Sequence, residues 1–168
     1  MQPTSAREAM VSAIRETQLR GFPLESITKE VLLEKNSLGE TPLHCAAIYD
    51  CLDKIPAKFL TKETLLIRDK SGQSVFGYSA IHNNLNQLPQ ELITEEMLLS
   101  PCGRGRNQEF KVLNAIANLD QLNQISGIHL SQKCEKIVGK EWLAKNNALI
   151  QAKKQLAEAP AEHEVDIF

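Results

Sequence analysis

Hydrophobic and polar positions recur along the first hundred residues with a spacing of 33 residues. Three stretches, beginning at residues 19, 52 and 85, align without gaps, and a looser fourth copy covers residues 111–122 after four additional residues. Internal periods of about 20–50 residues are typical of arrays in which each unit packs on its neighbours. The pattern therefore predicts stacked units along residues 19–130. The coinciding positions are Pro23, Pro56 and Pro89; Thr28, Thr61 and Thr94; Glu30, Glu63 and Glu96; Leu32, Leu65 and Leu98; and Gly39, Gly72 and Gly105.

Two helical segments are predicted within each unit. The first begins at Thr41-Pro42, because a threonine can cap a helix whose first turn tolerates a proline. Its alanines, Ala46 and Ala47, are small because paired helices approach closely there, and Ala80 has the same role in the next unit. A second, short helical turn follows each of Thr28, Thr61 and Thr94, where a capping residue and an acidic first turn precede Leu-Leu. The prolines upstream keep this second segment short.

The segment Gly-Glu-Thr-Pro-Leu-His-Cys-Ala-Ala at residues 39–47, with its 33-residue period, resembles the ankyrin repeat. Residues 69–72 resemble the Asp-x-x-Gly turn between such repeats, which requires a positive φ at Gly72. The resemblance covers about residues 5–130. It implies an all-α, ankyrin-like α-solenoid of about four 33-residue repeats with helical caps, in which Thr41 and His44 form hydrogen bonds within and between repeats. Where the family has a β-hairpin finger, the threonine-capped segments predict a short helix in each finger.

The ends of the array are expected to differ from its middle, because terminal units need a polar outer face. Residues 4–18 are predicted to form an N-terminal capping helix, with Ala9, Met10, Ala13 and Ile14 facing inward. Residues 131–158 are predicted to form a C-terminal cap that completes a domain of residues 1–158. Its long helix carries one apolar stripe that either covers the last repeat or binds a partner. Residues 159–168 are expected to be a disordered, acidic tail. The stripe consists of Val138, Trp142, Leu149, Ala152 and Leu156.

Composition places the chain among globular proteins without extreme charge. Of its 168 residues, 42% are hydrophobic and 24% are charged, and the net charge of −2 argues against general affinity for nucleic acid. No apolar run approaches the roughly 18 residues that span a membrane, and the first residues lack a secretory signal. The four cysteines form no CxxC pair, which favours reduced thiols in a cytosol. We therefore expect a cytoplasmic monomer without membrane association.

No set of residues has the spacing typical of a catalytic or metal site. The family resemblance makes His44 a structural residue, with zinc binding by His44, Cys45 and Cys51 as the alternative. Residues 101–107, with two glycines and two arginines, are either an anion-binding loop or a longer turn between repeats. Glu96 aligns with Glu30 and is interpreted as a charge at a helix N-terminus. We predict no catalytic residue, no cofactor and no metal.

The family resemblance implies a non-catalytic protein-interaction module, an adaptor, effector or inhibitor that binds another protein through a concave groove. A first alternative is docking to a replication or DNA-metabolism factor through the tail residues Asp166, Ile167 and Phe168. A second is an enzyme subunit that uses the loop of Arg104 and Arg106. The partner-binding residues predicted from the repeat positions are Leu38, Glu40, Ile48, Tyr49, Lys70, Gln73, Ile81, His82, Arg104, Arg106 and Leu119.

Overall fold

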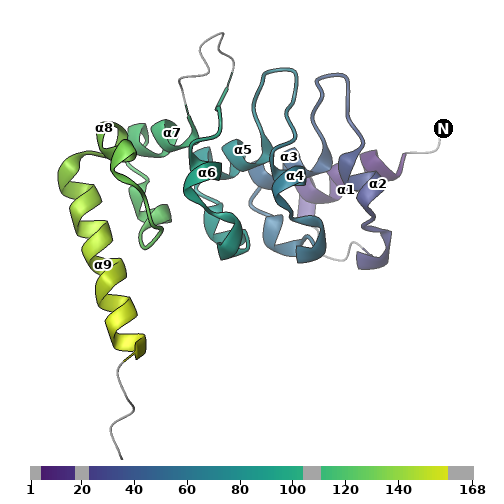
Figure 1. Ribbon diagram of the computed structural model, residues 1–168. Coiled ribbons are helices and arrows are strands. Elements are labelled where there is room, and N and C mark those ends of the chain that lie inside the picture. Colours follow the sequence, from purple (N-terminus) through teal and green to yellow (C-terminus); the bar gives the residue numbers. More distant parts are fainter. Residues whose placement is uncertain (1–4, 18–22, 104–110, 159–168) are drawn as a thin grey trace, which may run out of the picture.

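The computed structural model describes residues 5–17, 23–103 and 111–158, which form an all-α protein (Figure 1). Over these ranges there is no β-strand, only two isolated antiparallel bridges, Arg68–Ser74 and Pro101–Lys111. The α-helices are α1 (Ala6–Thr17), α2 (Lys29–Leu33), α3 (Pro42–Ile48), α4 (Lys62–Leu65), α5 (Val75–Ile81), α6 (Glu95–Leu98), α7 (Val112–Asn118), α8 (Glu135–Val138) and α9 (Lys140–Glu158). The 3-10 turns are η1 (Leu24–Ser26), η2 (Leu52–Lys54), η3 (Ala57–Phe59), η4 (Leu85–Gln87), η5 (Gln90–Leu92), η6 (Leu122–Ile125) and η7 (Gln132–Cys134).

The helices lie in two rows that follow the order of the chain. Helices α1, α3, α5 and α7 pack against one another in sequence, and α2, α4 and α6 pack on α3, α5 and α7 (Figure 1). Leu32, Leu65 and Leu98 occupy the same position in α2, α4 and α6, and all three are buried. Ala46, Ala47 and Ala80 are fully buried where α3 meets α5, as predicted from their small size.

The short helices after Thr28, Thr61 and Thr94 form where the sequence predicts them. In each, the threonine side chain accepts a hydrogen bond from the backbone N–H three residues on, at Val31, Thr64 or Met97. The 3-10 turns η1, η3 and η5 directly follow Pro23, Pro56 and Pro89. The prediction that these helices lie inside the fingers is wrong, because each helix ends before its loop begins. Two connecting loops, residues 34–41 and 66–74, run separately to the next helix, and residues 99–103 follow α6 (Figure 1).

The N-terminal capping helix is α1, and its inward face is one residue different from the prediction. Met10 and Ile14 are fully buried and Ala13 is half-buried, but Ala9 is exposed. Val11 is buried in its place, at 8% exposure. The buried face of α1 is therefore turned about the helix axis, away from Ala9 and toward Val11.

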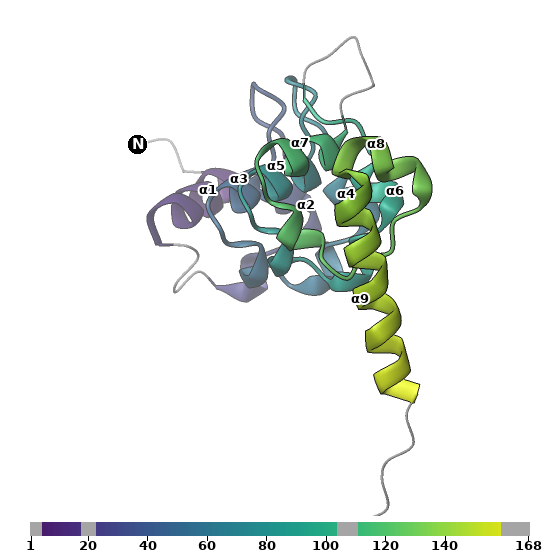
Figure 2. The same ribbon diagram turned by 90° about the vertical axis from the view of Figure 1, so that its left-hand side faces the viewer.

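The C-terminal cap covers less than the sequence predicts. Val138 in α8 and Leu143 and Asn146 in α9 are buried, whereas Leu149 is 39% and Leu156 is 77% exposed. Every residue from 151 to 158 is exposed, and Figure 2 shows this half of α9 extending away from the body. The prediction that the whole apolar stripe covers the last repeat is wrong for its second half, including Ala152. Only α8 and the first half of α9 close the array.

Candidate functional site

Three side chains occupy equivalent positions at the ends of α3, α5 and α7. Tyr49, His82 and Leu119 are the C-cap residues, and each precedes a residue with positive φ. Because that conformation turns the chain sharply, the C-cap side chain stands at the same point of each helix. Tyr49 is 40% and Leu119 is 48% exposed, and His82 is also exposed. The positive-φ residues are Asp50, Asn83 and Asp120, with φ of 60°, 63° and 55°.

The rings of Tyr49 and His82 each contact a neighbouring side chain, Arg15 and Tyr78 respectively. The guanidinium carbon of Arg15, on α1, lies 6.0 Å from the centre of the Tyr49 ring. The ring of Tyr78, one turn before His82, lies 6.2 Å from the His82 ring and 5.9 Å from the His44 ring. Cation–π and ring contacts of this kind restrain aromatic side chains while their faces stay partly open.

Asp69 fixes the second connecting loop and joins it to α5. Its Oδ1 accepts hydrogen bonds from the backbone N–H groups of Ser71 and Gln73, at 2.7 and 3.0 Å, and its Oδ2 accepts one from the Tyr78 hydroxyl at 2.9 Å. Burial alone would raise the pKa of Asp69, but these hydrogen bonds outweigh it and hold the pKa below its usual value. Asn36 accepts two equivalent bonds in the first loop.

Adjacent loops are tied together by bonds that recur every 33 residues. The Lys35 ammonium donates to the Arg68 carbonyl at 3.3 Å, and the Arg68 guanidinium donates to the Pro101 carbonyl at 2.8 Å. The backbone N–H of Lys70 donates to the Leu38 carbonyl at 2.8 Å. Exposed side chains such as Leu38 and Lys70 are therefore carried on a linked backbone.

The bond between Thr41 and His44 that the resemblance implies within a repeat is present, but the buried Nε2 of His44 has no hydrogen-bond partner among the described residues. The His44 side chain is fully buried, and its Nδ1 accepts the backbone N–H of Thr41 at 3.1 Å, which closes a capping box at the start of α3. Burial lowers the pKa of His44 below its usual value, although the charge of Asp69 and the carbonyl groups of Gln73 and Ile67 oppose that effect. A neutral imidazole is the form that can accept this hydrogen bond.

Most of the predicted partner-binding residues within the described ranges reach the surface, but Gln73 does not. Its side chain is 5% exposed and lies 3.4 Å from the Cys102 sulfur. The prediction that Gln73 contacts a partner is therefore wrong, because the side chain links two loops instead. Ile48, Ile81 and Glu40 are half-buried; Ile81 packs against the core, and Glu40 accepts a hydrogen bond from Asn36. Arg104, Arg106, Asp166, Ile167 and Phe168 lie outside the described residues.

Thiol and metal chemistry find little support in the geometry. All four cysteines are free and buried, and burial raises the pKa of each thiol, to about 11 for Cys51 and Cys134. Thiols of this kind are poor nucleophiles at neutral pH. Within the described ranges no three His, Cys, Asp or Glu side chains are grouped as a metal would require. No helix there is both long and apolar enough to cross a membrane.

Sequence reasoning missed a set of side-chain amides that connect successive units. Gln87 accepts from the Leu52 N–H at 2.8 Å, and Gln124 accepts from the Leu85 N–H at 3.4 Å. The buried side chain of Asn84 donates to the Ala47 carbonyl at 2.8 Å. Gln87 and Gln124 are 37 residues apart, which equals one period plus the four additional residues, so the sequence did contain this signal.

Comparisons of this chain with protein-family models, with curated proteins and with solved structures find no match. The residues and their geometry are therefore the basis on which a function can be inferred. They describe exposed apolar and aromatic side chains at equivalent C-terminal helix ends, and linked loops that lead into the start of the same helices.

Proposed function

We propose that this chain is an ankyrin-like solenoid of four repeats that binds another protein. The binding surface, called here the C-cap row, consists of Tyr49, His82 and Leu119 with Leu38 and Lys70 on the neighbouring loops. Three properties support the solenoid: the 33-residue period, the recurring order of helix, 3-10 turns, short helix and loop, and the packing of each helix on its sequence neighbours.

The observation that carries the proposal is the exposure of large apolar side chains in register. Leu38 is 59%, Tyr49 is 40% and Leu119 is 48% exposed, and Tyr49 and Leu119 stand at equivalent helix ends. Exposed apolar groups that lie together commonly mark an interface, and aromatic side chains often supply most of its energy. Arg15 already restrains the Tyr49 ring, so binding would cost less side-chain entropy there.

Recognition fits this surface better than catalysis does. Its groups are aliphatic side chains, aromatic rings and an amine. The loop carboxylate of Asp69 is engaged by Ser71, Gln73 and Tyr78, and that of Asp50, next to Tyr49, accepts a hydrogen bond from Gln87. A general base needs a free lone pair within reach of a substrate proton. We therefore assign the C-cap row to binding, in an intracellular setting where the buried cysteines stay reduced.

Site-specific photocrosslinking tests this proposal. A photoreactive amino acid at position 49 or 119 should capture a partner in cells, whereas the same group at the exposed Asp53 should not. With the captured partner purified, Tyr49→Ala should weaken binding by about 1–3 kcal/mol, roughly ten- to a hundredfold, without changing the melting temperature. Equal affinity of the wild type and Tyr49→Ala would show that the C-cap row is not the binding surface.

A further inference from the structure

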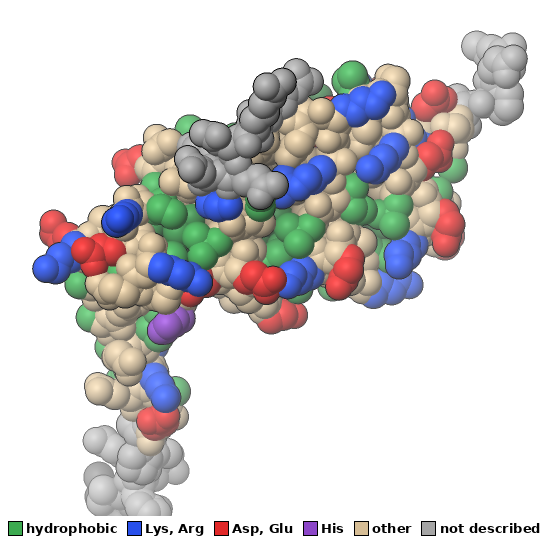
Figure 3. Space-filling view, turned by 45° about the horizontal axis from the view of Figure 1, so that its top comes forward, with side chains coloured by type: hydrophobic (Ala, Val, Ile, Leu, Met, Phe, Trp, Pro, Cys, Tyr) green, Lys and Arg blue, Asp and Glu red, His purple; other side chains and the backbone are tan. Residues whose placement is uncertain are grey.

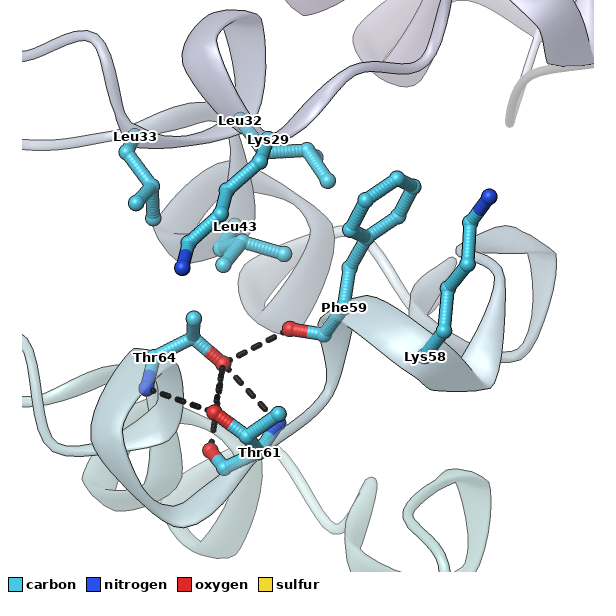
Figure 4. Close-up of a pocket in the computed structure, with 8 residues that line it drawn as sticks. All are labelled: Lys29, Leu32, Leu33, Leu43, Lys58, Phe59, Thr61 and Thr64. Atoms are coloured by element: carbon cyan, nitrogen blue, oxygen red, sulfur yellow. Dashed lines mark hydrogen bonds between the residues drawn. The ribbon is translucent and has the colours of Figure 1, made fainter.

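A small apolar pocket opens between the first and second units, on α2, η3 and α4 (Figure 4). Leu32, Leu33, Leu43 and Phe59 form its apolar walls, and Lys29 extends across it toward Thr64 (Figure 4). Lys58 stands beside Phe59, with its ammonium 4.9 Å from the ring centre. The pocket does not include any residue of the C-cap row.

The next interval of the array has different side chains at several wall positions, including Leu92 in place of Phe59. Moving 33 residues along the chain replaces Leu43 by Phe76 and Thr64 by Met97, and both larger side chains are buried, at 0% and 2% exposure. The first interval therefore has smaller side chains than the second at two of its wall positions, and it contains the pocket.

The charges at the rim also differ between the two intervals. The position of Lys58 is taken by Glu91 in the second interval, and Lys62, which replaces Lys29, is paired with Glu96 at 2.6 Å. Lys29 makes no hydrogen bond or salt bridge to a described residue, although its charge contributes to lowering the pKa of Glu63. The first interval therefore combines an apolar pocket with two lysines that form no salt bridge with the acidic side chains of the described ranges.

The chemistry that fits this pocket is one large apolar side chain flanked by carboxylates. Residues 162–168 of this chain, Glu-His-Glu-Val-Asp-Ile-Phe, have that composition: three acidic residues alternate with or precede Val165, Ile167 and Phe168. On the face shown in Figure 3, apolar side chains lie in patches along the body, with charged side chains beside them.

We propose that residues 162–168 of a second copy dock into this pocket, with Ile167 or Phe168 inside it and the acidic residues beside Lys29 and Lys58. A second copy is the source because the pocket lies at the N-terminal end of the array, whereas α9, which precedes the segment, leaves the opposite end (Figure 1). Each copy carries one pocket and one segment, so two copies can exchange segments reciprocally. A single anchor with a few exposed charge pairs gives a dissociation constant on the order of 0.1 mM.

Sedimentation equilibrium of the full chain, from about 10 µM to 1 mM, tests the proposal. The wild type should dimerise reversibly, and less so in 0.5 M salt, because exposed charge pairs are screened. A tail variant, Ile167→Ser with Phe168→Ser, and a pocket variant, Lys29→Glu with Lys58→Glu, should each stay monomeric. A wild type that stays monomeric to 1 mM would overturn the proposal.

Mixing the two variants separates a lost contact from a damaged fold. The pocket variant still carries an intact segment and the tail variant an intact pocket, so an equimolar mixture should form a one-way dimer. If the wild type dimerises but the mixture stays monomeric while both variants melt like the wild type, segment and pocket are not partners.

Two further variants serve as matched controls. Leu43→Phe with Thr64→Met introduces the larger side chains of the second interval at two wall positions and should abolish dimerisation while keeping the fold. Lys62→Glu, at the position equivalent to Lys29, should leave dimerisation unchanged, as should Tyr49→Ala in the C-cap row. If the Leu43→Phe, Thr64→Met variant still dimerises but Lys62→Glu does not, the two copies meet at another surface, and docking of residues 162–168 in this pocket is refuted.

Discussion

His44 and Asn114 occupy the same position in α3 and α7, the third residue after the cap. The Nδ1 of His44 accepts the backbone N–H of Thr41 at 3.1 Å, and the Oδ1 of Asn114 accepts that of Lys111 at 2.8 Å. Two different side chains thus satisfy one backbone donor that the helix itself leaves unpaired. The difference is that the imidazole can be protonated and the amide cannot.

Replacing His44 should therefore lower the free energy of unfolding, and it should do so most when the new residue cannot accept the Thr41 N–H. We expect His44→Ala to lower the free energy of unfolding by about 2–4 kcal/mol, from an unsatisfied buried donor and a cavity. His44→Asn should lose less, because an asparagine at this position can make the bond that Asn114 makes. Urea unfolding of the three proteins measures both changes, and equal losses in the two variants would show that the capping bond is unimportant.

The lowered pKa of His44 also predicts a dependence of stability on pH. In the unfolded chain the histidine takes up a proton near pH 6.5, whereas burial delays protonation of the folded chain to lower pH. Between these values the unfolded state binds more protons, so stability is present above about pH 6.5 and is lost as the pH falls. The slope is at most about 1.4 kcal/mol per pH unit for one group.

The comparison that isolates this effect is wild type against His44→Asn at pH 7, 6 and 5. The wild type should lose more stability over this range than the variant does. Asp69, whose pKa is below its usual 3.8, titrates outside the range and contributes equally to both proteins. Parallel losses would mean that His44 is not the titrating group.

Local signals in the sequence predict where the helices of this protein begin better than they predict which residues are buried. Thr28, Thr61 and Thr94 cap helices because the hydrogen bond involves residues only three apart, so the sequence contains the whole interaction. The position of Gln73 in the core and the exposure of Leu156 depend on which surfaces meet, and that information is not local. The predicted stripe of the C-terminal helix therefore differs from its buried face: Leu143 and Asn146 are buried, whereas Leu149 and Leu156 are exposed.

The two halves of α9 should respond differently to the same substitution. Leu143 is 3% exposed and Leu156 is 77% exposed in one helix. Leu143→Ala should lower the free energy of unfolding by about 2–5 kcal/mol, whereas Leu156→Ala should change it by no more than about 0.5 kcal/mol. Urea unfolding checks both values, and a large loss in Leu156→Ala would indicate that the second half of α9 packs against the body.

The whole molecule is held together by contacts between sequence neighbours. Packing runs from α1 to α3, α5, α7 and α8, and the loop bonds of Lys35 and Arg68 follow the same order. In the solenoid that we propose, stability is close to a sum of units and of the interfaces between them. Buried bonds across an interface should therefore control whether neighbouring units unfold together.

Asn84 is the buried side chain that tests this coupling. It is 5% exposed and donates to the Ala47 carbonyl in the preceding unit. Asn84→Ala should cost about 1–3 kcal/mol by leaving that carbonyl without its partner, and amide exchange should accelerate in α1 and α3 more than in α7. The neighbouring exposed Asn86→Ala is the control and should change stability by at most about 0.5 kcal/mol. Uniform acceleration in all helices would contradict the expectation.

The amides of Gln87 and Gln124 also have a consequence for how this chain could change in length. Each accepts the backbone N–H at the first residue of the preceding η2 or η4 turn, Leu52 or Leu85. If residues 52–84 were excised, Cys51 would be joined to Leu85, whose N–H already has its acceptor in Gln124. The new junction would need no contact of a new kind. A 33-residue block is thus the length of chain whose removal would keep the hydrogen-bond pattern at the junction unchanged.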